Sequence, residues 1–146
     1  MLEENQNTHD DNNRFQNISV GLLVDDLDER ENLALALKRL GVTQIVEYPT
    51  IEKMWTEVLS RPTSLIIVDI RLMNREGFYL KDHPLIKEGR ILTTIFYNSS
   101  DIPLLRSLGN FSYYGKIVRQ ANYCGPLNEI LGQASHVVRL ENKLVD

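Results

Sequence analysis

Short apolar runs alternate with amphipathic segments along this chain, and this alternation restricts its fold more than any other feature. Residues 18–24 (ISVGLLV) and 64–70 (SLIIVDI) predict buried strands, because both runs are short, apolar and rich in β-branched residues. Residues 43–48, 90–97 and 111–118 predict three further strands. Five strands, each followed by a helical segment, predict an α/β fold with a parallel sheet and helices on both faces.

Two helices have clear start and stop signals. In residues 28–41, Leu33, Leu37 and Leu40 share one helical face and Gly41 follows as the stop signal. Residues 51–59 carry apolar side chains at helical spacing, and Thr50 is their expected N-cap.

The later helical segments are less regular. Pro84 should break or kink any helix in residues 75–89. Asp101 is the expected N-cap of a short helix that has Pro103 in its first turn. The last helix should start near Pro126 and be interrupted at Gly132.

Length and composition narrow the class of protein. The 146 residues suggest one folded domain. We expect residues 1–17 to be a disordered, acidic arm, residues 18–135 to be the domain, and residues 136–146 to be a helical extension or linker. A net charge of −4 argues against direct nucleic-acid contact. The single cysteine, Cys124, suits a reducing cytoplasm, and no apolar run or leader predicts contact with a membrane.

Charged residues follow three of the predicted strands. Asp25 and Asp26 end the first, Asp69 ends the third, and Lys116 lies near the end of the fifth. In open parallel sheets, ligands bind beyond the carboxyl ends of the strands. If the first and third strands are neighbours, three carboxylates share one crevice, where Mg²⁺ and a lysine would offset their repulsion. This combination predicts phosphoryl transfer to a carboxylate.

Taken singly, most of these residues have an ordinary structural interpretation. Asp25, Asp26 or Asp28 can cap the helix that follows, Lys116 can be a solvated lysine, and residues 99–100 can be loop serines that cap a helix. The aspartate after LIIV is harder to explain in this way. The presence of such residues at the ends of several separate strands therefore favours a functional site.

Residues 18 to about 140 resemble the receiver domain of bacterial two-component response regulators. The resemblance rests on VDD, VDIRLMNREGF and YYGK, which lie at receiver-like spacings. It implies a flavodoxin-like (βα)5 doubly wound fold, with the five parallel strands in the order 2-1-3-4-5. It also implies that Asp69 is the phosphoacceptor, with Gly77 at the expected distance after it.

The resemblance assigns further site residues. Asp25, Asp26, Asp69 and the backbone carbonyl of Arg71 would hold Mg²⁺, with Asp26 as a direct ligand. Lys116 matches the family's lysine and would act with Asp69 and Ser99 in catalysis. Tyr113 matches the aromatic switch residue, and the Thr or Ser switch position falls on Ser99, Ser100 or Tyr97.

A signalling function follows from the resemblance. A sensor histidine kinase or a phosphotransfer protein would supply the phosphoryl group, and the domain would switch a protein interface. It would catalyse only its own phosphorylation and dephosphorylation, and so would not be a metabolic enzyme. A missing output domain would control transcription.

Several positions depart from the receiver pattern. Met73 and Ile117 stand where receivers usually have proline, and the second change removes an expected cis peptide. The segment before Lys116 is short, so the fourth helix should be truncated. These departures favour an alternative, a phosphorylation-independent pseudo-receiver that acts as an interaction or dimerisation module. A flavodoxin-type enzyme is disfavoured, because no glycine-rich phosphate loop follows the first strand.

The C-terminal helix carries an apolar seam. Its positions alternate at spacings of three and four, with one acidic interruption, at Leu127, Ile130, Ala134, Val137, Glu141 and Leu144. The first half should pack on the sheet. The second half predicts a homodimer through this helix, and the face of the fourth and fifth elements is the other candidate surface.

Overall fold

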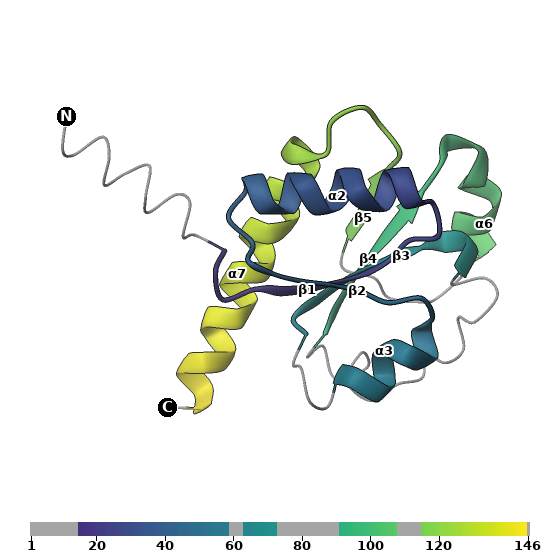
Figure 1. The fold of residues 1–146 in the computed structure, drawn as a ribbon. Helices are drawn as coiled ribbons and strands as arrows, with labels where there is room; N and C mark the ends of the chain where they lie inside the picture. Colours follow the sequence, from purple (N-terminus) through teal and green to yellow (C-terminus); the bar gives the residue numbers. More distant parts are fainter. Residues whose placement is uncertain (1–14, 59–62, 73–90, 108–114, 146) are drawn as a thin grey trace, which may run out of the picture.

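The computed structural model describes residues 15–58, 63–72, 91–107 and 115–145. The strands β1 (Ser19–Leu23), β2 (Gln44–Glu47), β3 (Leu65–Asp69), β4 (Leu92–Tyr97) and β5 (Gly115–Val118) form one parallel sheet. Their order is β2-β1-β3-β4-β5, which confirms the predicted order and places β1 beside β3 (Figure 1).

β3 is the central and most buried strand. All five of its residues are buried, as its apolar sequence predicts. It pairs with β1 through contacts such as Leu23 with Val68, and with β4 through Asp69 with Phe96. The strand therefore brings Asp69 to the carboxyl edge of the sheet between two neighbours.

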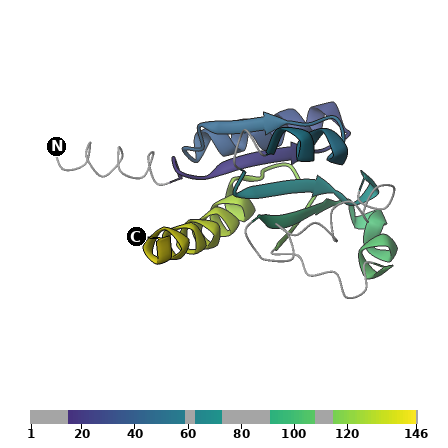
Figure 2. The same cartoon turned by 90° about the horizontal axis from the view of Figure 1, so that it is seen from below.

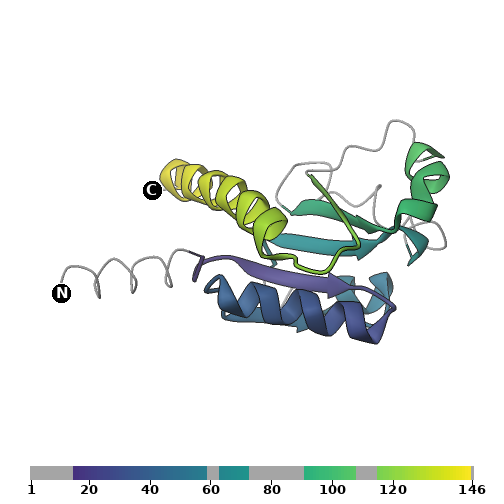
Figure 3. The same cartoon turned by 90° about the horizontal axis from the view of Figure 1, so that it is seen from above.

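Helices cover both faces of the sheet, as the sequence predicts. One buried cluster joins α2 (Leu27–Arg39) and α7 (Cys124–Val145) to the sheet through residues such as Leu33, Leu37 and Leu131. A second cluster on the other face contains Met54 of α3 (Ile51–Val58), with Leu104 of α6 (Ile102–Ser107) packed against it. Figure 1 shows α2 on one side of β1 and β2 and α3 on the other, and Figures 2 and 3 view the same arrangement from below and from above.

Three predicted helix signals are confirmed at atomic detail. Asp26 is the N-cap of α2, since one of its carboxylate oxygens accepts a hydrogen bond from the Glu29 amide at 3.1 Å. Gly41, after the helix, has a φ of 98°, which glycine adopts without strain. The Thr50 hydroxyl accepts from the Lys53 amide at 3.0 Å at the start of α3.

Three boundaries differ from those expected. α7 starts at Cys124 and runs for 22 residues, so Gly132 does not interrupt it. Asp101 is not a helix N-cap: it ends a 3-10 turn, η1 (Ser99–Asp101), that begins after Asn98 and leads into α6. Phe15 is 2% exposed and packs in the core, so the folded part begins before residue 18.

α7 extends well past the sheet. In Figures 1, 2 and 3 its C-terminal end lies at the opposite end of the molecule from α6. No helix within the described ranges is both long and apolar enough to cross a membrane. The predictions for Met73, Gly77, Pro84 and Tyr113 fall outside the described residues.

Candidate functional site

A pocket opens at the carboxyl ends of the strands. Two guanidinium groups, from Arg71 and Arg119, line it together with residues at the end of β4. Its carboxylates are Asp25, Asp26, Glu29, Asp69 and Asp101. They come from the β1–α2 segment, from β3 and from η1, so this edge gathers more acids than the sequence predicted.

Asp69 lies at the centre of this edge and is only 8% exposed. Its Oδ1 accepts a hydrogen bond from the Arg71 amide at 2.9 Å, and no described residue hydrogen-bonds to its Oδ2. Burial raises the pKa of Asp69, the charges of Asp25 and Asp101 raise it further, and the Arg71 amide opposes the change. The site thus holds a buried carboxylate with one oxygen that has no hydrogen-bond partner among the described residues.

The first turn of α2 supplies two more acids. Asp26 uses one oxygen for the helix cap, and its other oxygen lies 4.0 Å from Nη1 of Arg119. Glu29 is 7% exposed although it is charged. The capping interpretation of Asp26 is therefore correct, and the residue still turns one oxygen toward the pocket.

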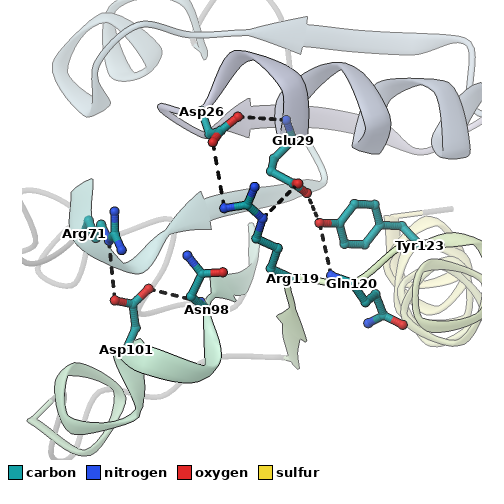
Figure 4. A network of polar contacts seen from close by, with 8 residues as sticks. All are labelled: Asp26, Glu29, Arg71, Asn98, Asp101, Arg119, Gln120 and Tyr123. Carbon is teal, nitrogen blue, oxygen red and sulfur yellow. Dashed lines mark hydrogen bonds and ion pairs between the residues drawn. The ribbon is translucent and has the colours of Figure 1, made fainter.

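Glu29 is held by two partners from the segment after β5. Arg119 Nε donates to Oε1 at 3.0 Å, and the hydroxyl of the buried Tyr123 donates to Oε2 (Figure 4). Burial and the bond to Glu29 raise the pKa of the Tyr123 hydroxyl well above its usual range. Phe96 packs edge to face against the Tyr123 ring at 6.0 Å. Both oxygens of Glu29 are thereby satisfied in a buried setting.

A second charged group lies beside Asp69. Arg71 Nε lies 3.4 Å from Oδ1 of Asp101, whose Oδ2 accepts from the Asn98 amide at 3.0 Å (Figure 4). Asp101 is 7% exposed, whereas the Arg71 side chain is 59% exposed. These contacts connect Arg71, Asp101 and the Asn98 backbone after β4, and all three residues line one part of the pocket.

Four of the predicted site residues come together, and two described ones do not. Asp25, Asp26, Asp69 and Arg71 all line the pocket. Lys116 is exposed on β5 opposite Ile95, makes no ion pair with a described carboxylate, and is not among the charges that shift the pKa of Asp69.

Ser99, one of the predicted switch residues, also lies outside the pocket. Ser99 is exposed in η1 and does not line the pocket, whereas Tyr97 does, as the last residue of β4. Of the three candidates for this position, Tyr97 has the best placement. Tyr113 lies outside the described residues.

Sequence reasoning missed Glu29 and Arg119, although the chain carries a signal for the first. Glu29 precedes Leu33 and Leu37 at four-residue spacing, which puts a charge on the buried face of α2. A charge at such a position requires a partner. Nothing in the sequence identifies Arg119 as that partner, because the pair spans 90 residues.

The Mg²⁺ site that the resemblance implies would draw on Asp26, Asp69 and the backbone carbonyl of Arg71, and it stays a prediction. No three acid, histidine or cysteine side chains of the described ranges are arranged to hold a metal ion. Asp26 Oδ1 and Asp69 Oδ1 are engaged by backbone amides, and the Arg119 guanidinium lies beside Asp26 Oδ2. Arg119 is therefore a cation of the chain itself that lies beside this carboxylate.

Comparison with known proteins supports the fold. No protein-family model matches the sequence, and no curated protein matches it. Among solved structures, full-length FixJ from B. japonicum, a response regulator, superposes with a TM-score of 0.66 at 14% sequence identity. The match covers 80% of this chain and 56% of that one, so the chain spans little more than half the length of FixJ. A likeness at this identity shows the fold alone, which is receiver-like.

Proposed function

We propose that this domain is a receiver-type signalling module in which Asp69 accepts a phosphoryl group and thereby changes a protein interface. The observation that supports it most is the setting of Asp69: a nearly buried carboxylate at the end of the central strand, with Oδ2 free of described partners. The donor would be a histidine kinase or a phosphotransfer protein.

The proposed step is an in-line transfer. Asp69 Oδ2 attacks the donor phosphorus, an O–P bond forms, and the donor's P–N bond breaks. The leaving nitrogen keeps the electron pair and takes up a proton. Arg71 and Arg119 line the same pocket, and their guanidinium groups can stabilise the negative charge of the transferred phosphoryl group. The domain is then a substrate of signalling enzymes and not a metabolic enzyme.

The interface is proposed from the helices. α7 begins directly after the Arg119 to Tyr123 segment, so a change in the pocket has a short path to this helix. We infer a homodimer through α7, and control of transcription by an output domain, without contact between this domain and nucleic acid. A cytoplasmic location and dependence on Mg²⁺ stay predictions.

A second candidate function is favoured by specific observations. Lys116 lies outside the pocket, and Arg119 is paired with Glu29. Both features suit a receiver-like interaction module that works without phosphorylation.

Intact mass separates the two candidates. The chain is incubated with a small-molecule phosphodonor, with and without Mg²⁺, and its mass is compared with that of Asp69→Ala. Asp28→Ala is the matched control, because Asp28 is an exposed aspartate in the first turn of α2 that does not line the pocket. The proposal expects one added phosphoryl group in the parent and in Asp28→Ala, and none in Asp69→Ala. An unchanged parent mass would favour the interaction module.

A further inference from the structure

The acidic pocket contains a cation that belongs to the chain itself. We propose that Arg119 is the resident counter-ion of this pocket, and that it keeps divalent cations away from Asp26 while it is in place. The inference concerns the same pocket as the proposed function but does not require that Asp69 be phosphorylated.

Arg119 contacts its neighbours through both its backbone and its side chain. Its amide donates to the Tyr97 carbonyl at 2.7 Å, which continues the β4–β5 pairing beyond the last residue of β5. Its Nε donates to Glu29 at 3.0 Å, and its Nη1 lies 4.0 Å from Oδ2 of Asp26. Figure 4 shows the guanidinium between these two carboxylates.

The oxygen that Arg119 approaches is the one that a metal would need. Asp26 Oδ1 accepts the Glu29 amide in the helix cap, so only Oδ2 can turn to a metal without loss of the cap. A guanidinium and a divalent cation repel each other, and they compete for this oxygen. Binding of a divalent cation at Asp26 therefore requires that the guanidinium move.

Arg119 has room to move, and Glu29 would keep a partner. The Arg119 side chain is 46% exposed, so its guanidinium can turn to solvent. Glu29 would then keep the hydrogen bond from the Tyr123 hydroxyl. Two arrangements of the pocket therefore exclude each other. In one, the Arg119 guanidinium lies beside Asp26; in the other, a divalent cation is bound to Asp26 and the guanidinium is displaced.

Arg71 does not fill this role. Its Nε pairs with Asp101, which also accepts a hydrogen bond from the Asn98 amide. Its guanidinium lies mostly in solvent, at 59% exposure of the side chain. The inference therefore singles out one of the two arginines of the pocket.

Binding of Mn²⁺ to the unphosphorylated full chain tests the inference. Free Mn²⁺ is followed by its electron paramagnetic resonance signal, and no phosphodonor is present. Arg119→Gln should bind Mn²⁺ about tenfold more tightly than the parent, a usual size for coupling between two sites. Lys53→Gln is the matched control, because it removes the same charge from an exposed position on α3 outside the pocket. Its affinity should equal that of the parent.

A double variant guards against misfolding and against a simple charge effect. Arg119→Gln leaves the buried Glu29 with one partner fewer, whereas Glu29→Gln combined with Arg119→Gln keeps the net charge of the parent. This double variant should also bind Mn²⁺ more tightly than the parent. Equal affinity for the parent and both Arg119 variants, or an equal gain in Lys53→Gln, would overturn the inference. Neither result depends on whether Asp69 accepts phosphate, so the two proposals fail separately.

Discussion

Arg119 Nε donates a hydrogen bond to the buried Glu29 carboxylate at 3.0 Å, across 90 residues of sequence. The pair ties the segment after β5 to the first turn of α2. Tyr123 completes it from the other side and immediately precedes α7. The acidic pocket and the start of the last helix therefore share one polar network (Figure 4).

Removal of the Tyr123 hydroxyl should destabilise the fold. Tyr123→Phe leaves one oxygen of the buried Glu29 without its donor, which should lower the free energy of unfolding by about 1 to 3 kcal/mol. Urea denaturation measures the change. Tyr97→Phe is the control, since Tyr97 lines the same pocket but its hydroxyl makes no hydrogen bond to a described residue. Equal losses in the two variants would show that the bond to Glu29 contributes nothing.

The same hydroxyl predicts a loss of stability in alkali. Burial, and then the bond to Glu29, raise the pKa of Tyr123 above its ordinary value of 10.0. Because the folded pKa lies above the unfolded one, the stabilising contribution is complete below the unfolded pKa and declines as pH rises through the folded pKa. The difference in free energy of unfolding between the parent and Tyr123→Phe should therefore shrink at strongly alkaline pH. Urea titrations of both proteins at neutral and alkaline pH check this, and a difference that grows with pH would contradict it.

Much of the fold could be predicted because its signals are local. The apolar run before Asp69 identifies the central strand, and Gly41 and Thr50 mark the helix ends where the structure has them. The pocket was only partly predictable. Asp69 and Asp26 follow strands and so reach the carboxyl edge, but which cation meets them depends on where β5 ends.

The cation that lines the pocket could not be predicted from the sequence. The structure pairs Tyr97 with Val118, so the chain after β5 delivers Arg119, not Lys116, to the edge. The match of Lys116 to the family motif does not reveal how β5 is aligned with β4. Spacing alone therefore predicted which acids line the pocket, but not which cation lies beside them.

A glycine in β1 is required by close packing. A Cβ at Gly21 would lie 3.0 Å from Cε2 of the buried Tyr48 and 3.4 Å from Cγ2 of Ile66. Gly21→Ala should lower the free energy of unfolding by about 1 to 3 kcal/mol, as overpacking does. Gly125→Ala, in the first turn of α7, is the matched control, because a Cβ there meets nothing within 4 Å. Thermal or urea unfolding should show no loss in this control, and a neutral Gly21→Ala would refute the packing argument.

Self-association should depend on the second half of α7. The apolar seam of the sequence continues to Val137 and Leu144, beyond the core contacts of Leu131 and Ala134. Burial of each such side chain in a helix pair contributes roughly 1 to 3 kcal/mol. Sedimentation should show a dimer for the full chain and a monomer for a version that ends at Ser135, which keeps Ala134 in the core. The dimer fraction of the full chain should grow after phosphodonor treatment. The same monomeric mass for both, in either condition, would leave α7 as a core element only.

The most direct measurement of the central claim is the identity of the residue that carries the phosphoryl group. The chain is treated with a phosphodonor, digested, and its peptides are sequenced by tandem mass spectrometry. The account predicts modification of the peptide that contains β3, at Asp69, and none at Asp25 or Asp26. A phosphoryl group on either of those aspartates, or on no aspartate while the domain remains folded, would contradict the assignment of Asp69 as the phosphoacceptor.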